Sequence, residues 1–179
     1  MLMEDDPAKP ASASRMSLAI ITEPGQANAY GTLHGGVLLR LADECGAICA
    51  LRHAGRGQIT TAAMDSMTFL GPVYVGERVE FLAEVTYVGR TSIETRIEVY
   101  AEAFDRPERR KVAVGYALYV ALDESGRRPR PVPPLLIETE AERRQLEAAR
   151  ARQDVRLARR ADAQARAGAD PPALAGGGT

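Results

Sequence analysis

The stretch from Asn28 to Cys49, NAYGTLHGGVLLRLADECGAIC, constrains the fold of this chain more than any other. A polar, glycine-rich loop runs without a break into a strongly apolar segment. The apolar side chains recur at the spacing of a helix with one buried face, at Leu38, Leu41, Cys45, Ile48 and Cys49. The stretch therefore predicts a long helix that the rest of the domain must cover.

The opposite face of this predicted helix is unusual because it is not a normal solvated face. It carries small residues with a single carboxylate among them, at Gly36, Asp43, Ala47 and Ala50. A helix that is apolar on most sides is enclosed by its fold, and an aspartate there needs a partner or a task. Gly35 and Gly36 also let another molecule approach the free N–H groups at the positive end of the helix dipole. The stretch thus offers an oxyanion site and a carboxylate about two helical turns apart.

Composition divides the 179 residues into three parts. Apolar residues are dense from Met16 to Ile137, whereas the chain beyond Glu138 is almost entirely Ala, Arg, Glu, Gln and Asp. The sequence predicts a disordered segment at 1–15, a folded domain at 16–137, and a charged helical tail at 138–179 that ends in a disordered segment.

Charge and hydropathy favour a cytoplasmic protein that binds neither nucleic acid nor membrane. The formal net charge is -1, no run of about 18 apolar residues occurs, and the N-terminus is acidic rather than signal-like. The two cysteines, Cys45 and Cys49, lie one turn apart in the predicted helix. That geometry does not favour a disulfide, so we expect both to be buried apolar residues.

Five segments outside the helix are predicted to be strands, at 16–22, 59–69, 79–87, 93–102 and 112–122. The third and fourth alternate apolar with polar residues, as antiparallel strands with one wet face do. The last is continuously apolar and is predicted to be a central strand covered on both faces. The fold class is therefore α+β, with a five-stranded antiparallel sheet wrapped around the long helix. Because such a sheet leaves edges exposed, we expect at least a dimer.

The sequence also makes predictions for the C-terminal segment and for the end of the long helix. The segment 137–167 has strong helix formers and pairs such as Glu140 with Arg144, but no apolar stripe, so it predicts a solvated helix dispensable for chemistry. Its Arg-rich second half, 150–166, offers an alternative role in attracting phosphates or an acidic partner. His53, near the end of the long helix, is predicted to be a surface capping residue.

Several kinds of site are excluded by missing motifs. The HGG at His34–Gly36 lacks the G-x-S-x-G that a serine hydrolase needs. Two histidines without Cys-x-x-Cys give no zinc ligand set, and no G-x-G-x-x-G or Walker sequence is present for a nucleotide cofactor. The sequence predicts no metal and no cofactor. Asn28, the helix N-terminus and Asp43 remain as candidates.

The pattern N-x-x-G-x-x-H-G-G followed by a helical aspartate resembles the hotdog-fold acyl-CoA thioesterases of the acyl-CoA hydrolase type. The resemblance continues, in order, through TTAAMDSMTF at 60–69, PVYVGE at 72–77, VGRTS at 88–92 and ALYVALD at 117–123. It covers roughly residues 16–135. It implies a hotdog fold in which one long helix is wrapped by the sheet and two subunits pair as a double hotdog.

The resemblance also implies roles for the candidates. Asn28 of one subunit faces Asp43 of the other, Asp43 is the base or nucleophile, the Gly36 N–H polarises the thioester carbonyl, and His34 helps to position that loop. Each has a structural alternative: Asp43 supports the dimer, Asn28 is a turn residue, and His34 makes a structural hydrogen bond. The implied substrate is acyl-CoA, and the implied assembly is a dimer within a trimer of dimers.

One further site follows from the resemblance. The turn Gly89, Arg90, Thr91 and Ser92 occupies the place where the family often holds the nucleotide end of coenzyme A, with Arg90 on phosphate. A hairpin turn without such a role is an equal alternative. Asp65, inside a strand, is predicted to be a buried structural carboxylate.

Two other functions remain as alternatives to thioester hydrolysis. A hotdog hydratase or dehydratase would place a histidine beside the acid, and the chain does not put His34 or His53 there in the expected order. A non-catalytic acyl-CoA-binding regulator would lack the Asn and Asp pair or carry a DNA-binding segment, and neither holds. The preferred function is therefore hydrolysis of an acyl-CoA of undetermined chain length.

Overall fold

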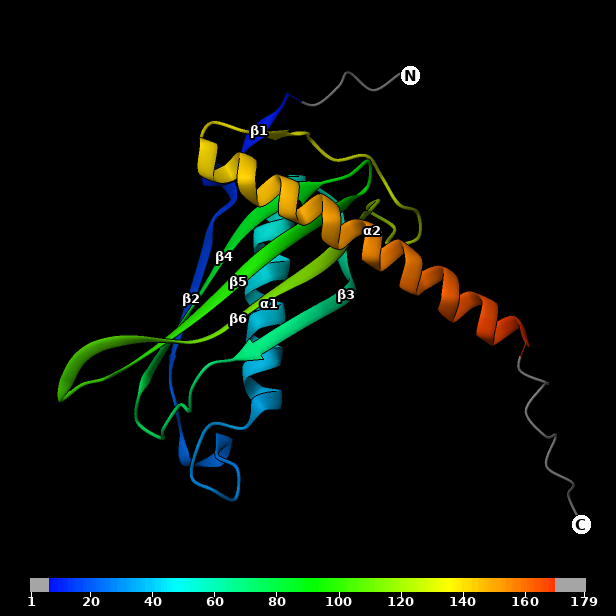
Figure 1. Cartoon of the computed structure of the whole chain (residues 1–179). Coiled ribbons are helices and arrows are strands. Elements are labelled where there is room, and N and C mark those ends of the chain that lie inside the picture. The colour runs from blue at the N-terminus through cyan, green and yellow to red at the C-terminus, as the bar shows by residue number, and fades with distance from the viewer. Residues whose placement is uncertain (1–6, 170–179) are drawn as a thin grey trace, which may run out of the picture.

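The computed structural model describes residues 7–169 and has three layers (Figure 1). The middle layer is an antiparallel sheet of five strands in the order β2-β4-β5-β6-β3. Helix α1 lies against one face and helix α2 crosses the other. The bounds are β2 Met16–Ile21, α1 Gly35–Ala54, β3 Gln58–Phe69, β4 Arg78–Val88, β5 Ser92–Ala103, β6 Arg106–Leu122 and α2 Glu140–Ala169. The predicted α+β architecture, with one long helix against a five-stranded antiparallel sheet, is confirmed.

The continuously apolar segment 112–122 belongs to β6, which is an interior strand between β5 and β3, as predicted. Alternate residues of β6, such as Ala117 and Tyr119, are fully buried on the α1 side. The residues between them are only half-buried. The outward face is apolar because α2 covers part of it, with the Arg152 guanidinium 3.7 Å from the centre of the Tyr116 ring.

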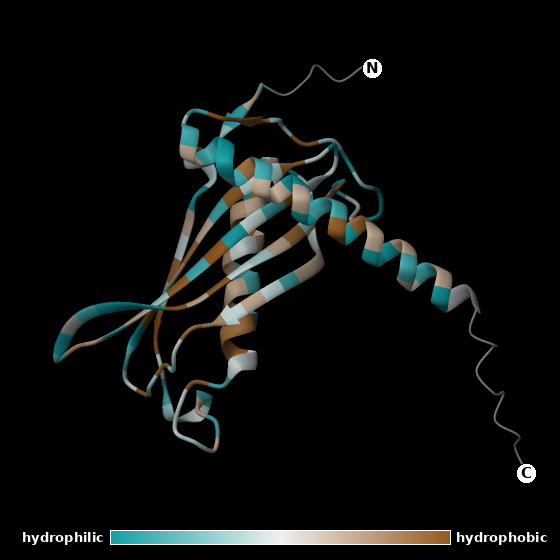
Figure 2. Cartoon of the chain, viewed as in Figure 1, coloured by the Kyte–Doolittle hydropathy of each residue, from teal (hydrophilic) through white to brown (hydrophobic). Residues whose placement is uncertain are grey.

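The core forms between α1 and the inner face of the sheet. Its largest fully enclosed side chains come from β4, β5 and β6 and include Phe81, Ile97 and Tyr119. Figure 2 shows hydrophobic and hydrophilic residues alternating along these strands, as expected of a sheet with one face against a core. The helix, however, is not enclosed on all sides, since Ile48 is 39% exposed and Leu51 is 40% exposed. One sheet covers only one side of a helix, so the predicted burial of Ile48 is wrong for a single subunit.

The ends of α1 are fixed by different means. At its start the His34 ring caps the helix by accepting a hydrogen bond from the Gly36 N–H. At its end Gly55 takes a left-handed conformation, with φ of 81°, that favours glycine. His53 is fully buried and is not the predicted surface cap. Its ring lies between the Ser14 hydroxyl, 3.2 Å from Nδ1, and the Pro133 carbonyl, 3.0 Å from Nε2.

The N-terminal segment differs from the disorder predicted for residues 1–15. Strand β1 (Lys9–Pro10) pairs in parallel with β7 (Leu135–Leu136), and the short helix η1 (Ala11–Ser14) follows it. Composition indicates whether a segment can form its own core, but here the partner strand comes from the distant segment before α2. Residues 1–6 and 170–179, also predicted to be disordered, lie outside the described residues. A second short helix, η2 (Pro24–Gln26), leads into the loop before α1.

Helix α2 begins at Glu140, three residues after the predicted start. Thr139 and Glu142 bond each other's backbone N–H groups, which is the arrangement of a capping box. The prediction of a solvated helix is wrong for its middle, because Ala149 is fully buried and two arginines form ion pairs with the sheet. Asp65, one of their partners, is a largely buried structural carboxylate, as predicted.

Cys45 and Cys49 are free and buried, as predicted. Burial raises the pKa of Cys45 to about 11 and that of Cys49 to about 12, so neither thiol ionises readily near neutral pH. Along the described part of the chain, no helix has the length and hydropathy needed to cross a membrane.

Candidate active site

Asp43 lies on the side of α1 that faces β3 and β6, where two hydroxyl groups bind it. The Thr61 hydroxyl donates to the carboxylate, at 3.0 Å from Oδ1 and 3.3 Å from Oδ2. The Tyr119 hydroxyl lies 3.2 Å from Oδ1 and 3.1 Å from the backbone carbonyl of Asp43. Asp43 is half-buried and Thr61 is exposed, so the carboxylate is held in place yet can be reached from outside.

A β-bulge in β3 places Thr61 at this site. In a regular strand Thr61 and Asp65, four residues apart, would share a face. The pairing with β6 shifts register between Thr61 and Ala63, so the residue between them has no paired residue on β6. Thr61 therefore faces α1 and Asp43, whereas Asp65 faces α2 and Arg156. The role of Thr61 could not be predicted from the sequence, because the motif that contains it does not show where the bulge lies.

Asn28 organises the loop before α1. Its side-chain oxygen accepts hydrogen bonds from the backbone N–H groups of Tyr30, at 2.9 Å, and Thr32, at 3.2 Å. Its amide nitrogen donates to the Thr32 hydroxyl at 2.9 Å. An amide NH₂ has two hydrogens, so this network leaves one further donor for a ligand. Asn28 is thus a turn residue in the single subunit, and its amide also remains able to bind another molecule.

The predicted oxyanion donor is already engaged. The Gly36 N–H donates to Nδ1 of His34 at 2.9 Å, which gives the exposed His34 ring a structural hydrogen bond at the helix N-terminus. A substrate oxygen can reach this N–H only if the imidazole moves aside. Beside it, the Phe69 ring at the end of β3 packs on Gly35, whose added Cβ would lie 3.5 Å from the ring.

The structure does not bring the two halves of the predicted site together within one subunit. Gly36 and Asp43 are seven residues apart on one straight helix, a separation of about 10 Å along its axis. Asn28 lies beyond the start of that helix and hydrogen-bonds within its own loop. One group therefore contains Asn28, His34 and Gly36, and a separate group contains Asp43.

The turn from Gly89 to Ser92 joins β4 to β5, with the Gly89 N–H 2.8 Å from the Ser92 carbonyl oxygen. The carbonyl of the exposed Arg90 accepts from the Val132 N–H at 3.2 Å, in the segment whose Pro133 binds His53. The turn therefore lies near the C-terminal end of α1, at the opposite end of the molecule from the Asn28 loop. Within one subunit, the turn is therefore far from both Asn28 and Gly36.

Large apolar side chains are exposed around the N-terminal end of α1. Tyr30 is 91% exposed, and Phe69 and Leu70 are 52% and 55% exposed. All three lie in the Asn28 loop or at the end of the edge strand β3. Exposed apolar groups gathered beside an unpaired edge are typical of a surface that a partner covers.

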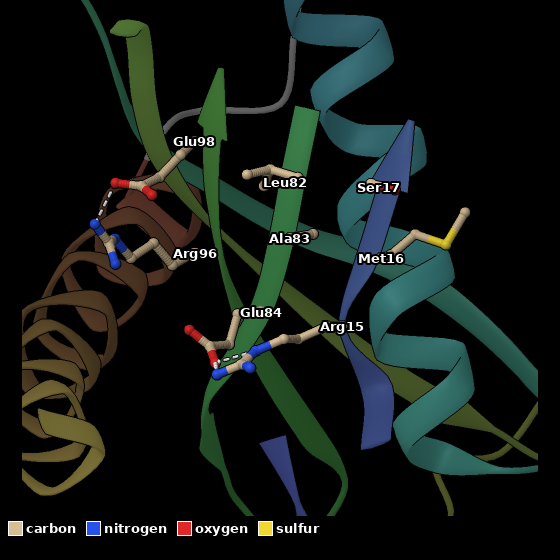
Figure 3. Close-up of a pocket in the computed structure, with 8 residues that line it drawn as sticks. All are labelled: Arg15, Met16, Ser17, Leu82, Ala83, Glu84, Arg96 and Glu98. Atoms are coloured by element: carbon tan, nitrogen blue, oxygen red, sulfur yellow. Dashed lines mark hydrogen bonds and ion pairs between the residues drawn. The ribbon is translucent and has the colours of Figure 1, made fainter. Parts of the chain in front are cut away.

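A hollow on the outer side of β4 and β5 offers no comparable chemistry (Figure 3). Its charged groups are already paired, Arg15 with Glu84 at 2.5 Å and Arg96 with Glu98. Its other lining residues are Met16, Ser17, Leu82 and Ala83. Within the described residues no group of three or more His, Cys, Asp or Glu side chains could hold a metal ion.

Comparison with known proteins identifies the family. The model of the Thioesterase superfamily matches residues 30–103. An uncharacterized acyl-CoA thioester hydrolase of Zymomonas mobilis is 36% identical over 125 residues, which cover 70% of this chain and 83% of that protein.

Solved structures of acyl-CoA hydrolases are also similar. The acyl-CoA hydrolase from Staphylococcus aureus, in complex with butyryl coenzyme A, coenzyme A and coenzyme A disulfide, superposes with a TM-score of 0.81 at 32% identity, covering 88% of this chain and 95% of that one. Structures of that enzyme with an Asp, an Asn or a Thr replaced by Ala are similar too. A hexameric thioesterase from Yersinia pestis gives a TM-score of 0.61 at 36% identity, covering 65% of this chain and 93% of that one. The chain therefore belongs to the hotdog-fold acyl-CoA thioester hydrolases of the thioesterase superfamily.

Proposed function

We propose that the protein hydrolyses an acyl-CoA thioester at a site shared by two subunits. One subunit supplies Asp43, and the other supplies Asn28 and the N-terminal end of its α1. The observation that carries this proposal is the separation of about 10 Å between Gly36 and Asp43 along one helix, which a single subunit cannot close. Pairing two subunits through the exposed β3 edge and the apolar groups beside it would bring the two halves together.

The chemistry requires a base or nucleophile, a polarised carbonyl and a positioned water. Asp43 either removes a proton from water, which then attacks the thioester carbon, or attacks that carbon itself and is released by water. In both routes the carbon–sulfur bond breaks, the thiolate of coenzyme A takes a proton, and a carboxylic acid is formed. The free amide hydrogen of Asn28 orients the water or the thioester oxygen.

The oxyanion donor in this proposal is the Gly36 N–H. The thioester oxygen replaces His34 Nδ1 as the acceptor, so substrate binding moves the imidazole aside. One hydrogen bond at an oxyanion is worth roughly a hundred- to thousandfold in rate, because the charge there develops only in the transition state. Replacing a capping side chain by the reacting oxygen costs the helix no hydrogen bond, since one acceptor takes the place of another.

Two observations support the assignment beyond the geometry. The residue types replaced in the S. aureus variants, an Asp, an Asn and a Thr, are those of Asp43, Asn28 and the threonine that binds Asp43 here, Thr61. The Y. pestis relative is hexameric, and we propose a dimer as the smallest active unit here, within a trimer of dimers. The exposed Arg90 guanidinium of the turn at Gly89–Ser92 is proposed to pair with a phosphate of coenzyme A.

The test is a panel of acyl-CoA esters of increasing chain length, with released coenzyme A measured by a thiol reagent. Asp43→Asn should lower kcat at least about a hundredfold, because general-base catalysis contributes that much or more, while coenzyme A binding and the melting temperature change little. Glu44→Gln is the matched control, since the next carboxylate along α1 is exposed and pairs with Arg40, and it should keep wild-type kcat.

Two results would contradict this function. If Asp43→Asn retains wild-type kcat, the carboxylate is structural and the proposed chemistry fails. If the wild-type protein binds acyl-CoA but releases no coenzyme A from any ester, it is the non-catalytic regulator that was considered as an alternative.

A further inference from the structure

The reaction proposed above assigns no role to the buried side chain of Tyr119. It lies on the inner face of β6, is fully enclosed, and points its hydroxyl at α1. The hydroxyl lies 3.1 Å from the Asp43 carbonyl oxygen and 3.2 Å from its Oδ1. It therefore contacts both the helix backbone and the side chain of the proposed catalytic acid.

A glycine makes room for this contact. Gly46 is three residues after Asp43 and lies on the same side of the helix. A Cβ added at Gly46 would lie 2.4 Å from the Tyr119 hydroxyl and 3.2 Å from the side chain of Ile97. Real side chains do not approach so closely, so any larger residue at Gly46 would push the phenol away from Asp43. The contact between Tyr119 and Asp43 therefore depends on the absence of a side chain at Gly46.

The Tyr119 hydroxyl stays protonated and is therefore always a hydrogen-bond donor. Burial, together with the neighbouring Asp43 carboxylate, raises the pKa of Tyr119 well above its ordinary value of 10.0. The hydroxyl thus keeps its one hydrogen at any working pH and shares it between the Asp43 carbonyl oxygen, at 3.1 Å, and Oδ1 of the carboxylate, at 3.2 Å. Thr61 donates to Oδ1 at 3.0 Å and more weakly to Oδ2 at 3.3 Å, so two donors converge on Oδ1. Oδ2 is the oxygen left for the reaction.

We propose that Tyr119 is a positioning residue for thioester hydrolysis, which holds the Asp43 carboxylate so that Oδ2 faces the substrate. This rests on the proposed function, because Tyr119 would act only through Asp43, which it contacts. Its loss should leave the Asp43 carboxylate less well oriented toward the substrate.

The variant that tests this is Tyr119→Phe, which keeps the ring in the core and removes only the hydroxyl. We expect kcat to fall about tenfold with KM within about twofold, because the lost hydrogen bond is to a charged group and the ligand contacts are unchanged. Tyr116→Phe is the matched control on the outer face of the same strand, where the ring lies under Arg152, and it should match the wild type in both kcat and KM.

A double-variant cycle separates this inference from the proposed function. In an Asp43→Asn background, Tyr119→Phe should cause no further loss of the residual rate, because its effect is transmitted through the carboxylate. An equal loss in both backgrounds would show a general packing role and overturn the inference, as would a wild-type kcat for Tyr119→Phe. A wild-type kcat for Asp43→Asn alone would overturn the proposed function itself.

Discussion

His53 shows how one buried side chain makes the stability of the fold depend on pH. Burial lowers the pKa of His53 below its ordinary value of 6.5, outweighing the opposite effect of the hydrogen bond to Pro133. In the neutral ring, Nε2–H donates to the Pro133 carbonyl and Nδ1 accepts from the Ser14 hydroxyl. Every polar atom of the ring is then satisfied, and the histidine joins η1 to the segment before α2.

The sign of the resulting pH dependence follows from this lowered pKa. Below about pH 6.5 the unfolded chain binds a proton at His53 that the folded chain resists, so the free energy of unfolding falls as the pH is lowered, by at most about 1.4 kcal/mol per pH unit. Urea unfolding between pH 7.5 and pH 5.5 measures this slope. His53→Gln, which retains hydrogen-bonding groups without titrating there, should have a shallower slope. An identical slope in the two proteins would show that His53 titrates normally.

At the scale of elements, α2 is joined to the sheet through a buried carboxylate. Glu94 on β5 is fully buried and accepts from Arg152 at 2.7 Å and from Arg156. Arg156 also donates to Asp65 on β3, with its Nε 2.5 Å from Oδ2. Two arginines of one helix thus bind carboxylates on two different strands. Both guanidinium groups are paired, so they are not available for the phosphate role considered for the Arg-rich half of the tail.

Removing Arg156 should destabilise the fold, because the carboxylates of Glu94 and Asp65 lose an ion-pair partner where little water can reach them. We expect Arg156→Leu to lower the free energy of unfolding by about 3 kcal/mol, the typical cost of breaking a buried ion pair from one side. Arg160→Leu, one turn further along at an exposed position, is the control and should change it by less than about 0.5 kcal/mol. Urea unfolding at a fixed protein concentration compares them. Equal stability of Arg156→Leu and the wild type would show that α2 is the inert helix that its sequence predicted.

The contrast between elements shows what the sequence could predict. Strands with clear alternation and the helix from Gly35 to Ala54 follow from local pattern and capping, and so does the choice of Asp43 as the notable carboxylate. The docking of α2 could not be predicted in the same way, because it uses arginines rather than an apolar stripe. The role of Thr61 depends on a bulge in β3, and that of Tyr119 depends on the position of β6 in the sheet. Both are long-range features that no single segment encodes.

At the scale of the whole molecule, the proposed function requires a second subunit to complete the site and to cover the exposed apolar surface. The half with Asn28 and Gly36 is separated from the half with Asp43, and apolar residues such as Tyr30 and Phe69 are exposed beside the unpaired edge. Ile48 and Leu51 on the open side of α1 are also partly exposed. A second subunit that covers these groups would complete two equivalent sites at once, because a two-fold interface repeats every contact.

The central claim, that each site combines Asn28 of one subunit with Asp43 of the other, is tested by mixing inactive variants under conditions of proven subunit exchange. Random mixing of equal amounts of Asn28→Ala and Asp43→Ala should restore about a quarter of the wild-type activity, because half of the dimers are mixed and each holds one intact site of two. The control mixes the wild type equally with the double variant. There, shared sites predict that about a quarter of the sites remain intact, whereas sites within one subunit predict about half.

Thioester hydrolysis in the exchanged mixtures is therefore the most direct measurement. The composite site predicts about a quarter of the wild-type rate in both mixtures. No recovery in the mixture of single variants, together with about half of the rate in the control mixture, would contradict it and place Asn28 and Asp43 in the same subunit's site.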